Sequence, residues 1–256
     1  MTATTKDAAE RWLSRAVPRP DAEVELFCLP YAGAGASAYR EWPAAFGPEI
    51  EVTALRLPGR ENRIRERPEV DPVAVASVIA SVVGAGRPYA LFGHSMGGRL
   101  GFEVIRELRR AGRPLPVRLY PSGIIPPDQR SRSVLDGVSR VPDDELVERL
   151  TAGGGMPEVL LAEPDLLDLF LPVLRADLTW LDDYEYVPGD PIPVPVVAFA
   201  GESDPVAPLS KMDGWTAHTS AGFTLHTLPG GHFFLHEQVD RIAGVIMADL
   251  LGTRTP

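Results

Sequence analysis

Residues 89–100 read YALFGHSMGGRL, and this stretch decides the fold. A short apolar run leads directly into Gly-x-Ser-x-Gly, and apolar side chains then recur at helical spacing. This order predicts a strand, a sharp turn that holds Ser95 in a strained backbone conformation, and a helix. Gly93 and Gly97 flank the serine because larger side chains at these positions would collide across so tight a turn.

Short apolar runs alternate with helical patterns on both sides of this stretch. The predicted strands are Val24–Leu29, Ile50–Leu57, Tyr89–Phe92, Val117–Tyr120, Val194–Ala200 and Phe223–Leu228. The predicted helices span residues 37–46, 72–84, 98–111, 206–218 and 237–251. Most of the strand runs are apolar throughout, which is typical of strands covered on both faces. The alternation predicts a mostly parallel, doubly wound α/β sheet in a single domain of residues 1–256.

Residues 133–190 interrupt the alternation because they contain no strand pattern. Helical patterns cover Asp143–Thr151 and Pro164–Tyr184, and the second holds more apolar side chains than one buried stripe of a surface helix requires. Long insertions of this kind are usually functional, so we interpret residues 133–190 as a helical lid over an apolar pocket. The alternative is a helix hairpin that only completes the core. The residues that we expect at the pocket are Tyr31, Phe170, Leu174 and Phe233.

A serine hydroxyl becomes a nucleophile only with a base within hydrogen-bonding reach. Our candidate base is His232, which lies in a glycine-rich loop directly after the last predicted strand. The other histidines have structural interpretations. His94 supports the turn, and His218 ends a helix. His226 lies within a strand, and His236 opens the final helix.

The base in turn needs a carboxylate that orients it and stabilises its charged form. Asp204 directly follows the predicted strand Val194–Ala200 and is the candidate, with Glu202 as the alternative. Ser95, Asp204 and His232 therefore each follow a different strand, and the carboxyl ends of parallel strands meet at one edge of a sheet. Their order along the chain is that of α/β-hydrolases, so the sequence predicts an α/β-hydrolase fold and a serine hydrolase.

Acyl transfer also requires backbone N–H groups that stabilise the oxyanion. Met96, which follows the serine, is expected to supply one. Ala32, in a loop of small residues after the first strand, is expected to supply the second, with Tyr31 and Gly33 as alternatives. The Gly-x-Gly in this loop lacks the third glycine of a dinucleotide-binding motif.

Several segments together resemble the free-standing type II thioesterases that accompany modular polyketide and nonribosomal peptide synthases. The segments that carry the resemblance are residues 27–33, 57–61, 93–98, 169–177, 201–205 and 230–234. The resemblance extends over about residues 20–250, and one departure is Tyr31, where many relatives have histidine.

The resemblance implies hydrolysis of acyl groups from the phosphopantetheine arm of acyl or peptidyl carrier proteins, which clears stalled or misprimed chains. It implies Ser95 as nucleophile, His232 as base, Asp204 as acid, and Ala32 and Met96 as oxyanion donors. It implies no metal and no cofactor, because the pantetheine arm belongs to the partner. The alternatives are a carboxylesterase or lipase-like hydrolase, a product-cyclising thioesterase, a carrier protein modified at Ser95, and a non-catalytic binding protein of the same fold.

The charge balance restricts the partners. Acidic residues outnumber basic ones by 35 to 25, and the net charge of −10 excludes nucleic acid and anionic membranes as main partners. Five arginines and two glutamates nevertheless lie between residues 56 and 67. This local positive excess would attract an acidic carrier protein; the alternative is a solvated loop with internal ion pairs.

Two further expectations concern the cellular setting. The longest strongly apolar uncharged stretch, residues 72–86, is too short to span a bilayer, and we find no signal-peptide pattern. The single cysteine, Cys28, lies in an apolar run and cannot form an internal disulfide, which indicates a reducing cytoplasm. We also expect the protein to be a monomer.

Overall fold

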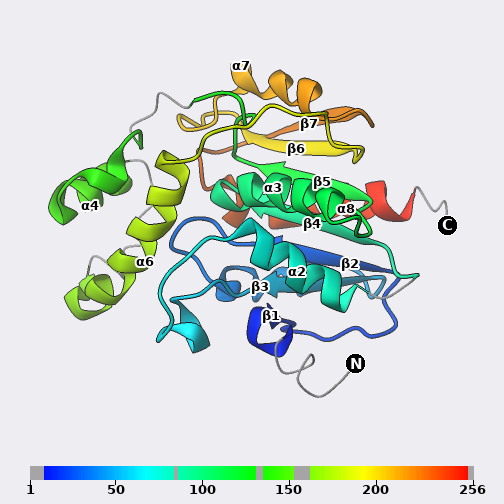
Figure 1. Ribbon diagram of the computed structural model, residues 1–256, viewed down its shortest axis with the longest axis horizontal. Helices are drawn as coiled ribbons and strands as arrows, with labels where there is room; N and C mark the ends of the chain where they lie inside the picture. The colour runs from blue at the N-terminus through cyan, green and yellow to red at the C-terminus, as the bar shows by residue number, and fades with distance from the viewer. Residues whose placement is uncertain (1–8, 84–85, 131–134, 153–161, 253–256) are drawn as a thin grey trace.

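Seven strands form one sheet in the computed structural model, which describes residues 9–83, 86–130, 135–152 and 162–252 (Figure 1). The order across the sheet is β1-β3-β2-β4-β5-β6-β7. The strands are β1 (Leu13–Ser14), β2 (Val24–Leu29), β3 (Ile50–Leu55), β4 (Tyr89–His94), β5 (Arg118–Ser122), β6 (Val196–Gly201) and β7 (Phe223–Leu228). β1 runs antiparallel to β3, and every other neighbouring pair is parallel. The predicted mostly parallel sheet is therefore confirmed.

Most of the helices lie in the connections between the parallel strands, and the last of them follows the last strand. They are α2 (Pro72–Val82), α3 (Met96–Arg110), α4 (Asp143–Ala152), α6 (Pro164–Asp182), α7 (Leu209–Met212) and α8 (Val239–Leu251). The start of α2 illustrates how the sequence sets these limits. The Asp71 side chain accepts a hydrogen bond from the Val73 N–H at 2.8 Å, and Pro72 occupies the first helical position, where its missing N–H has no cost.

Two predictions of helices were wrong about the kind of helix, because both ranges contain 3₁₀ helices. Residues 37–46 form two 3₁₀ helices, Ala36–Tyr39 and Trp42–Ala45, instead of one α-helix. Pro43 would interrupt the hydrogen bonds of a continuous helix, and it lies instead in the first turn of the second 3₁₀ helix. Residues 206–218 form the short α7 and a 3₁₀ helix, Asp213–His218. The periodicity of apolar side chains did not reveal these tighter turns. The two-residue strand β1 is also too short to leave a pattern.

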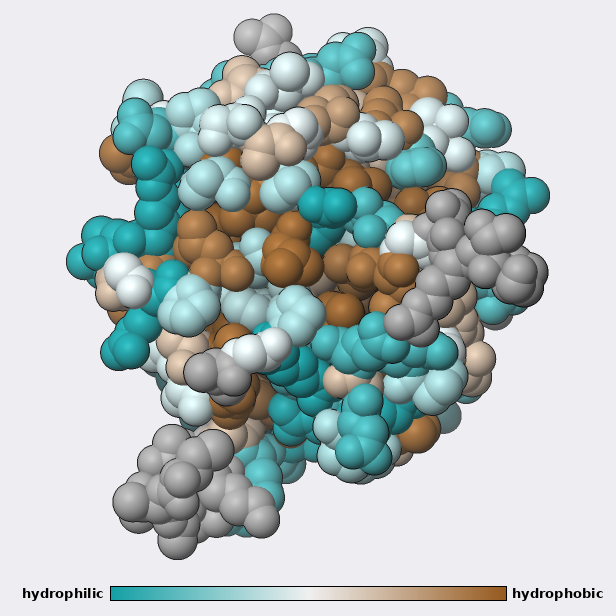
Figure 2. Space-filling model, turned by 90° about the vertical axis from the view of Figure 1, so that its right-hand side faces the viewer, coloured by the Kyte–Doolittle hydropathy of each residue, from teal (hydrophilic) through white to brown (hydrophobic). Residues whose placement is uncertain are grey.

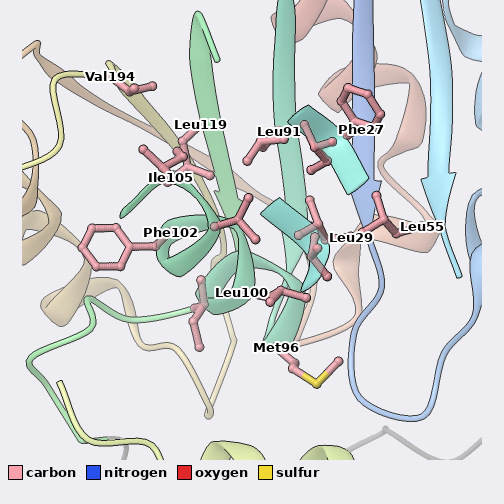
Figure 3. Close-up of a cluster of buried hydrophobic side chains, with 14 of the residues drawn as sticks. Phe27, Leu29, Leu55, Leu91, Met96, Leu100, Phe102, Ile105, Leu119 and Val194 are labelled. Atoms are coloured by element: carbon pink, nitrogen blue, oxygen red, sulfur yellow. The ribbon is translucent and has the colours of Figure 1, made fainter. Parts of the chain in front are cut away.

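Each face of the sheet carries its own core, and alternate residues of a strand contribute to different cores. Phe27 and Leu29 pack with Leu100 and Ile105 of α3 on one face (Figure 3). Their neighbours in β2, with Phe92 of β4, pack with α8 on the other face. Because side chains alternate across a strand, coverage of both faces requires the continuous apolar runs seen in the sequence.

α4 and α6 belong to the segment between β5 and β6 and lie at one end of the sheet, on the left in Figure 1. Their facing side chains form a separate apolar cluster with the 3₁₀ helix Val138–Arg140. The buried residues of this cluster are Val138, Leu146, Leu150, Leu171, Leu174 and Leu178. The apolar surplus of α6 thus stabilises the insertion itself. Part of the predicted insertion, residues 133–134 and 153–161, lies outside the described residues.

The opposite end of the molecule is seen in Figure 2, where apolar side chains near the middle are surrounded by polar ones.

Hydrogen bonds to Asp249 hold α8 against the sheet. The Asp249 carboxylate accepts them from Arg118 Nε at 2.6 Å and from the Tyr120 hydroxyl at 2.6 Å. Within the described residues, no helix has the length and apolar character that crossing a membrane requires.

We expect Phe199→Ala to destabilise the fold by about 3–5 kcal/mol, because truncating a buried aromatic ring removes apolar contacts and leaves a cavity. Phe199 of β6 is fully buried and contacts the rings of Phe92, Tyr120 and His226. Urea denaturation measures the change. Val187→Ala, at a side chain 65% exposed, serves as the control and should cost less than about 0.5 kcal/mol. Equal losses in the two variants would contradict this placement of Phe199.

Candidate active site

The connection between β4 and α3 is a single residue, Ser95, in an unusual backbone conformation. Its φ of 50° and ψ of −117° lie in a region that L-residues rarely occupy; among the described non-glycine residues only Glu61 shares a positive φ. The Ser95 N–H donates to the Ser122 carbonyl at 2.7 Å and so attaches the turn to the neighbouring strand. The strained turn predicted from Gly-x-Ser-x-Gly is therefore present.

Three glycines make this turn sterically accessible. A Cβ atom on Gly93 would lie 2.2 Å from the Gly97 carbonyl, and one on Gly97 would lie 2.2 Å from the Leu29 carbonyl oxygen. A Cβ atom on Gly98 would lie 2.6 Å from a methyl group of Ile124. Because most of these obstacles are backbone atoms that cannot move aside, larger residues would displace the turn.

The loops after β6 and β7 bring together the candidate acid and base. His232 Nδ1 lies 2.9 Å from Asp204 Oδ2, and both residues are buried. The other carboxylate oxygen accepts hydrogen bonds from the Val206 and Ala207 N–H groups at 2.8 and 3.0 Å, which fixes its orientation. An Nδ1–H donor to Asp204 leaves Nε2 as the basic nitrogen. Glu202, the alternative acid, is exposed.

Ser95 and His232 line the same cavity, whose volume is about 790 Å³. Within the described residues, no hydrogen bond links the Ser95 hydroxyl to the imidazole. Such contacts in ligand-free sites are often long and shorten only when substrate binds. The Ser95 hydroxyl and the His232 imidazole therefore face the same cavity but are not hydrogen-bonded to each other.

The expected pocket residues divide into two groups. Tyr31, Leu174 and Phe233 line the cavity together with Ser95. Phe170 is not among its lining residues; it lies against the loop after β2, where a Cβ atom on Gly33 would be 2.5 Å from Phe170 Cζ. The sequence placed Phe170 at the pocket because its helix is rich in apolar residues, but periodicity does not reveal which neighbour each side chain contacts.

The expected oxyanion donors are the backbone N–H groups of Ala32 and Met96. Ala32 lines the cavity, and Met96 is the first residue of α3, where N–H groups have no partner within the helix. The alternative donor Gly33 is already engaged, because its N–H donates to Asp177 Oδ2 at 2.8 Å. This contact favours Ala32 over Gly33.

His94 packs beneath the turn, as its structural interpretation suggested. It is fully buried, its Nδ1 lies 3.0 Å from the Ser122 hydroxyl, and its ring centroid lies 5.0 Å from that of His232. Burial lowers the pKa of His94 well below its ordinary value, and positive charge on His232 lowers it further. A neutral His94 therefore supports the site without competing as a second cation.

The remaining histidines have structural partners, although two differ from expectation. His218 does not cap carbonyl groups but pairs through Nε2 with Asp128 Oδ1 at 2.7 Å. His236 precedes the final helix, in the 3₁₀ helix Phe234–His236, and its Nε2 lies 3.3 Å from the Tyr31 hydroxyl. His226 lies within β7, as expected, and its ring stacks on that of Phe199 in β6.

The arginine-rich segment 56–67 is largely paired within the chain. Arg63 is buried, binds Glu66 at 2.6 Å and lies over the Trp12 ring. Arg56 lies 3.7 Å from Glu61, and Arg60 forms a buried ion pair with Asp177. Arg65 and Arg67 are exposed. The structure thus favours the alternative of internal ion pairing for most of this segment.

Asp177 and Arg60 are the pair that sequence reasoning missed. Both lie in segments that carried the family resemblance, yet neither had an assigned role. Burial raises the pKa of the Asp177 carboxyl, and hydrogen bonds from Arg60 and the Gly33 N–H oppose that rise. The only signal in the sequence is a charged residue among the apolar residues of a helix, and it does not identify the partner.

A strained serine between strand and helix and a histidine–aspartate pair at the same sheet edge define the α/β-hydrolase class. Comparison with known proteins narrows this class. Residues 24–250 match the family model of the thioesterase domain. The chain belongs to the thioesterase family.

The individual relatives agree with this assignment. The chain is 34% identical over 229 residues to the gramicidin S biosynthesis protein GrsT of Aneurinibacillus migulanus, covering 89% of each. Its structure is similar to RedJ, a thioesterase of the prodiginine pathway in Streptomyces coelicolor, with a TM-score of 0.82 and 34% identity. The match covers 91% of this chain and 92% of RedJ. It is also similar to BorB, a type II thioesterase from the borrelidin biosynthetic cluster. The TM-score is 0.79 and the identity 36%, and the match covers 92% of this chain and 96% of BorB.

We expect His94→Asn to make the folded state less sensitive to acid. Because the folded-state pKa of His94 is lowered, the unfolded chain binds a proton near pH 6.5 that the folded chain does not. The resulting stability is present above that pH and is lost progressively as the pH falls below it. Urea denaturation at several pH values compares the two proteins. Identical pH dependence in wild type and variant would contradict a buried neutral His94.

Proposed function

We propose that this thioesterase hydrolyses acyl groups from the phosphopantetheine arm of acyl or peptidyl carrier proteins and so clears stalled or misprimed chains in polyketide or nonribosomal peptide synthesis. The observation that carries the proposal is the placement of Ser95, on its strained turn, at the same cavity as the Asp204-bound His232. The relatives support the choice of pathway, since GrsT is named for gramicidin S biosynthesis and BorB is a type II thioesterase from the borrelidin biosynthetic cluster.

The first half of the proposed reaction transfers the acyl group to the enzyme. His232 Nε2 takes the proton of the Ser95 hydroxyl while Oγ attacks the thioester carbonyl. The resulting oxyanion accepts hydrogen bonds from the Ala32 and Met96 N–H groups. When the intermediate collapses, the carbon–sulfur bond breaks, and the pantetheine sulfur receives the proton that His232 carries.

The second half releases the acid. His232 removes a proton from a water molecule, which attacks the Ser95 ester, and the same two N–H groups hold the second oxyanion. Collapse of this intermediate returns the proton to Ser95 Oγ and frees the carboxylic acid. Asp204 holds the imidazole in position and stabilises its charged form throughout. The proposed reaction requires no metal and no cofactor of the chain's own.

The cavity is suited to an acyl chain because α4 and α6 supply much of its apolar wall. The leucines of this segment that line it are Leu135, Leu150, Leu174, Leu178 and Leu181. An acyl chain bound in this cavity would contact these side chains. We propose that this wall sets the preferred chain length.

The carrier partner and the cellular setting complete the proposal. With most of segment 56–67 paired internally, Arg65 and Arg67 are the arginines of this segment that remain exposed to attract an acidic carrier. Cys28 is buried and free, as suits a protein of a reducing cytoplasm. We propose that the monomer is the active species.

Two rivals remain distinguishable by experiment. A carboxylesterase would use the same residues, so rates on matched thioester and oxygen-ester substrates with one acyl group separate the two activities. A non-catalytic binding protein would hydrolyse neither. Preference for the thioester on a carrier protein over the free pantetheine thioester would support carrier recognition.

We expect Ser95→Ala to lower turnover of an acyl-carrier thioester on the order of 10⁶-fold, because it removes the nucleophile. His232→Ala should be comparably damaging, since the base and nucleophile act as one unit. His226→Gln is the matched control, because this histidine lies in β7 against Phe199. Near-native turnover by Ser95→Ala would remove this residue from the proposed role.

We expect Leu178→Ala to raise the kcat/KM ratio of long to short acyl groups several-fold, because it enlarges the cavity by three carbons. Leu171→Ala is the matched control: it is equally buried in the same helix and cluster but is not among the residues that line the cavity. Acyl-pantetheine substrates of graded length provide the measurement. The same selectivity change in both variants would indicate that the effect comes from loosening the helix rather than from the cavity wall.

A further inference from the structure

The ion pair between Arg60 and Asp177 is the most completely buried arginine–carboxylate pair in the described part of the chain. Asp177, on α6, is 0% exposed, and Arg60 is 5% exposed. The contact is bidentate: Arg60 Nη2 donates to Asp177 Oδ1 at 2.7 Å, and Nη1 donates to Oδ2 at 2.8 Å. Two parallel hydrogen bonds fix the relative orientation of the two side chains as well as their distance.

Both members of the pair also bind the loop after β2. Asp177 Oδ2 accepts the Gly33 N–H at 2.8 Å, and Arg60 Nη1 donates to the Ala34 carbonyl at 2.7 Å. These contacts hold two consecutive residues of the loop immediately after Ala32, the proposed oxyanion donor. The orientation of the Ala32 N–H is therefore tied to the geometry of this pair.

The same face of α6 packs on the loop. Phe170, Leu174 and Asp177 recur at the spacing of one helix face, and all three reach Gly33. Gly33 has a φ of +78°, and a Cβ atom there would lie 2.5 Å from Phe170 Cζ and 3.2 Å from Leu174 Cδ1. Glycine at this position thus lets the helix approach closely enough for Asp177 to bind the backbone.

Net stabilisation is a poor explanation for this arrangement. Removing two charges from water is costly, and apolar side chains of similar volume often stabilise a protein as well or better. What apolar side chains lack is the ability to hold a backbone N–H and a carbonyl in one orientation. Neither Arg60 nor Asp177 is among the residues that line the catalytic cavity, so the pair acts through the loop rather than on the substrate.

We propose that Arg60 and Asp177 are positioning residues that hold the Ala32 N–H in the oxyanion hole and couple it to α6. The inference rests on the proposed hydrolysis at Ser95. The transition state depends on this N–H more than the bound substrate does, so loss of the pair lowers kcat and leaves KM nearly unchanged. Removal of one oxyanion donor typically costs 10²–10³-fold in kcat, and we expect about 10²-fold.

The test replaces the pair by apolar residues of similar size, in the double variant Arg60→Met/Asp177→Leu. Arg118→Met/Asp249→Leu is the matched control, because it removes the bidentate ion pair between β5 and α8. The readouts are kcat and KM on an acyl-pantetheine thioester, together with the rate at which a fluorophosphonate labels Ser95. Thermal unfolding and circular dichroism verify that each variant is folded.

We expect the Arg60/Asp177 variant to be folded, with kcat and the labelling rate both about 10²-fold lower and KM within about twofold of wild type. The control should retain wild-type kcat. A folded variant with wild-type kcat and labelling rate, or with raised KM alone, would overturn the proposal. Asp177→Asn, which keeps the side-chain shape, should lower kcat in the same way, and an unchanged kcat there would overturn it as well.

The labelling rate separates this inference from the proposed function. Phosphonylation of serine also builds negative charge on an oxygen at the oxyanion site, whatever the natural substrate. Wild-type protein that is labelled at Ser95 but hydrolyses no thioester would contradict the proposed function alone. The effect of the double variant on labelling would still decide whether the pair positions the loop.

Discussion

The backbone conformation of Ser95 is the constraint on which the site depends. A φ of 50° is costly for a residue with a side chain, and it persists because β4, in the middle of the sheet, and α3 fix the chain on both sides. Gly93 and Gly97 leave room for the turn, and the Ser95 N–H is held by the neighbouring β5. The hydroxyl is thereby presented at the sheet edge, where the loops after β6 and β7 place Asp204 and His232.

The segment with α4 and α6 contributes to this edge of the sheet in three ways. Its own apolar cluster gives it internal stability, its leucines form part of the cavity wall, and Asp177 joins it to the loop after β2. In the proposed mechanism, the helix whose leucines line the acyl cavity is therefore also the helix that holds the loop of the oxyanion donor Ala32. Displacement of α6 would affect the shape of the pocket and the chemistry at Ser95 together.

Sequence alone predicted the parallel sheet, six of its seven strands to within about two residues, and the loops that carry Ser95, Asp204 and His232. These features are local, since a buried strand and a glycine turn leave their pattern in consecutive residues. The partnership of Arg60 and Asp177 spans 117 residues and leaves no such pattern. Arg60 therefore counted only as one member of a basic loop, and Phe170 only as one apolar residue of a helix.

The most direct measurement is a crystal structure of the protein phosphonylated by a fluorophosphonate. We predict an adduct on Ser95 Oγ, with its phosphoryl oxygen roughly 2.7–3.1 Å from the Ala32 and Met96 nitrogens and His232 still bound to Asp204. An adduct on another residue, or a phosphoryl oxygen that points away from both N–H groups, would contradict the assignment of this sheet edge as the catalytic centre.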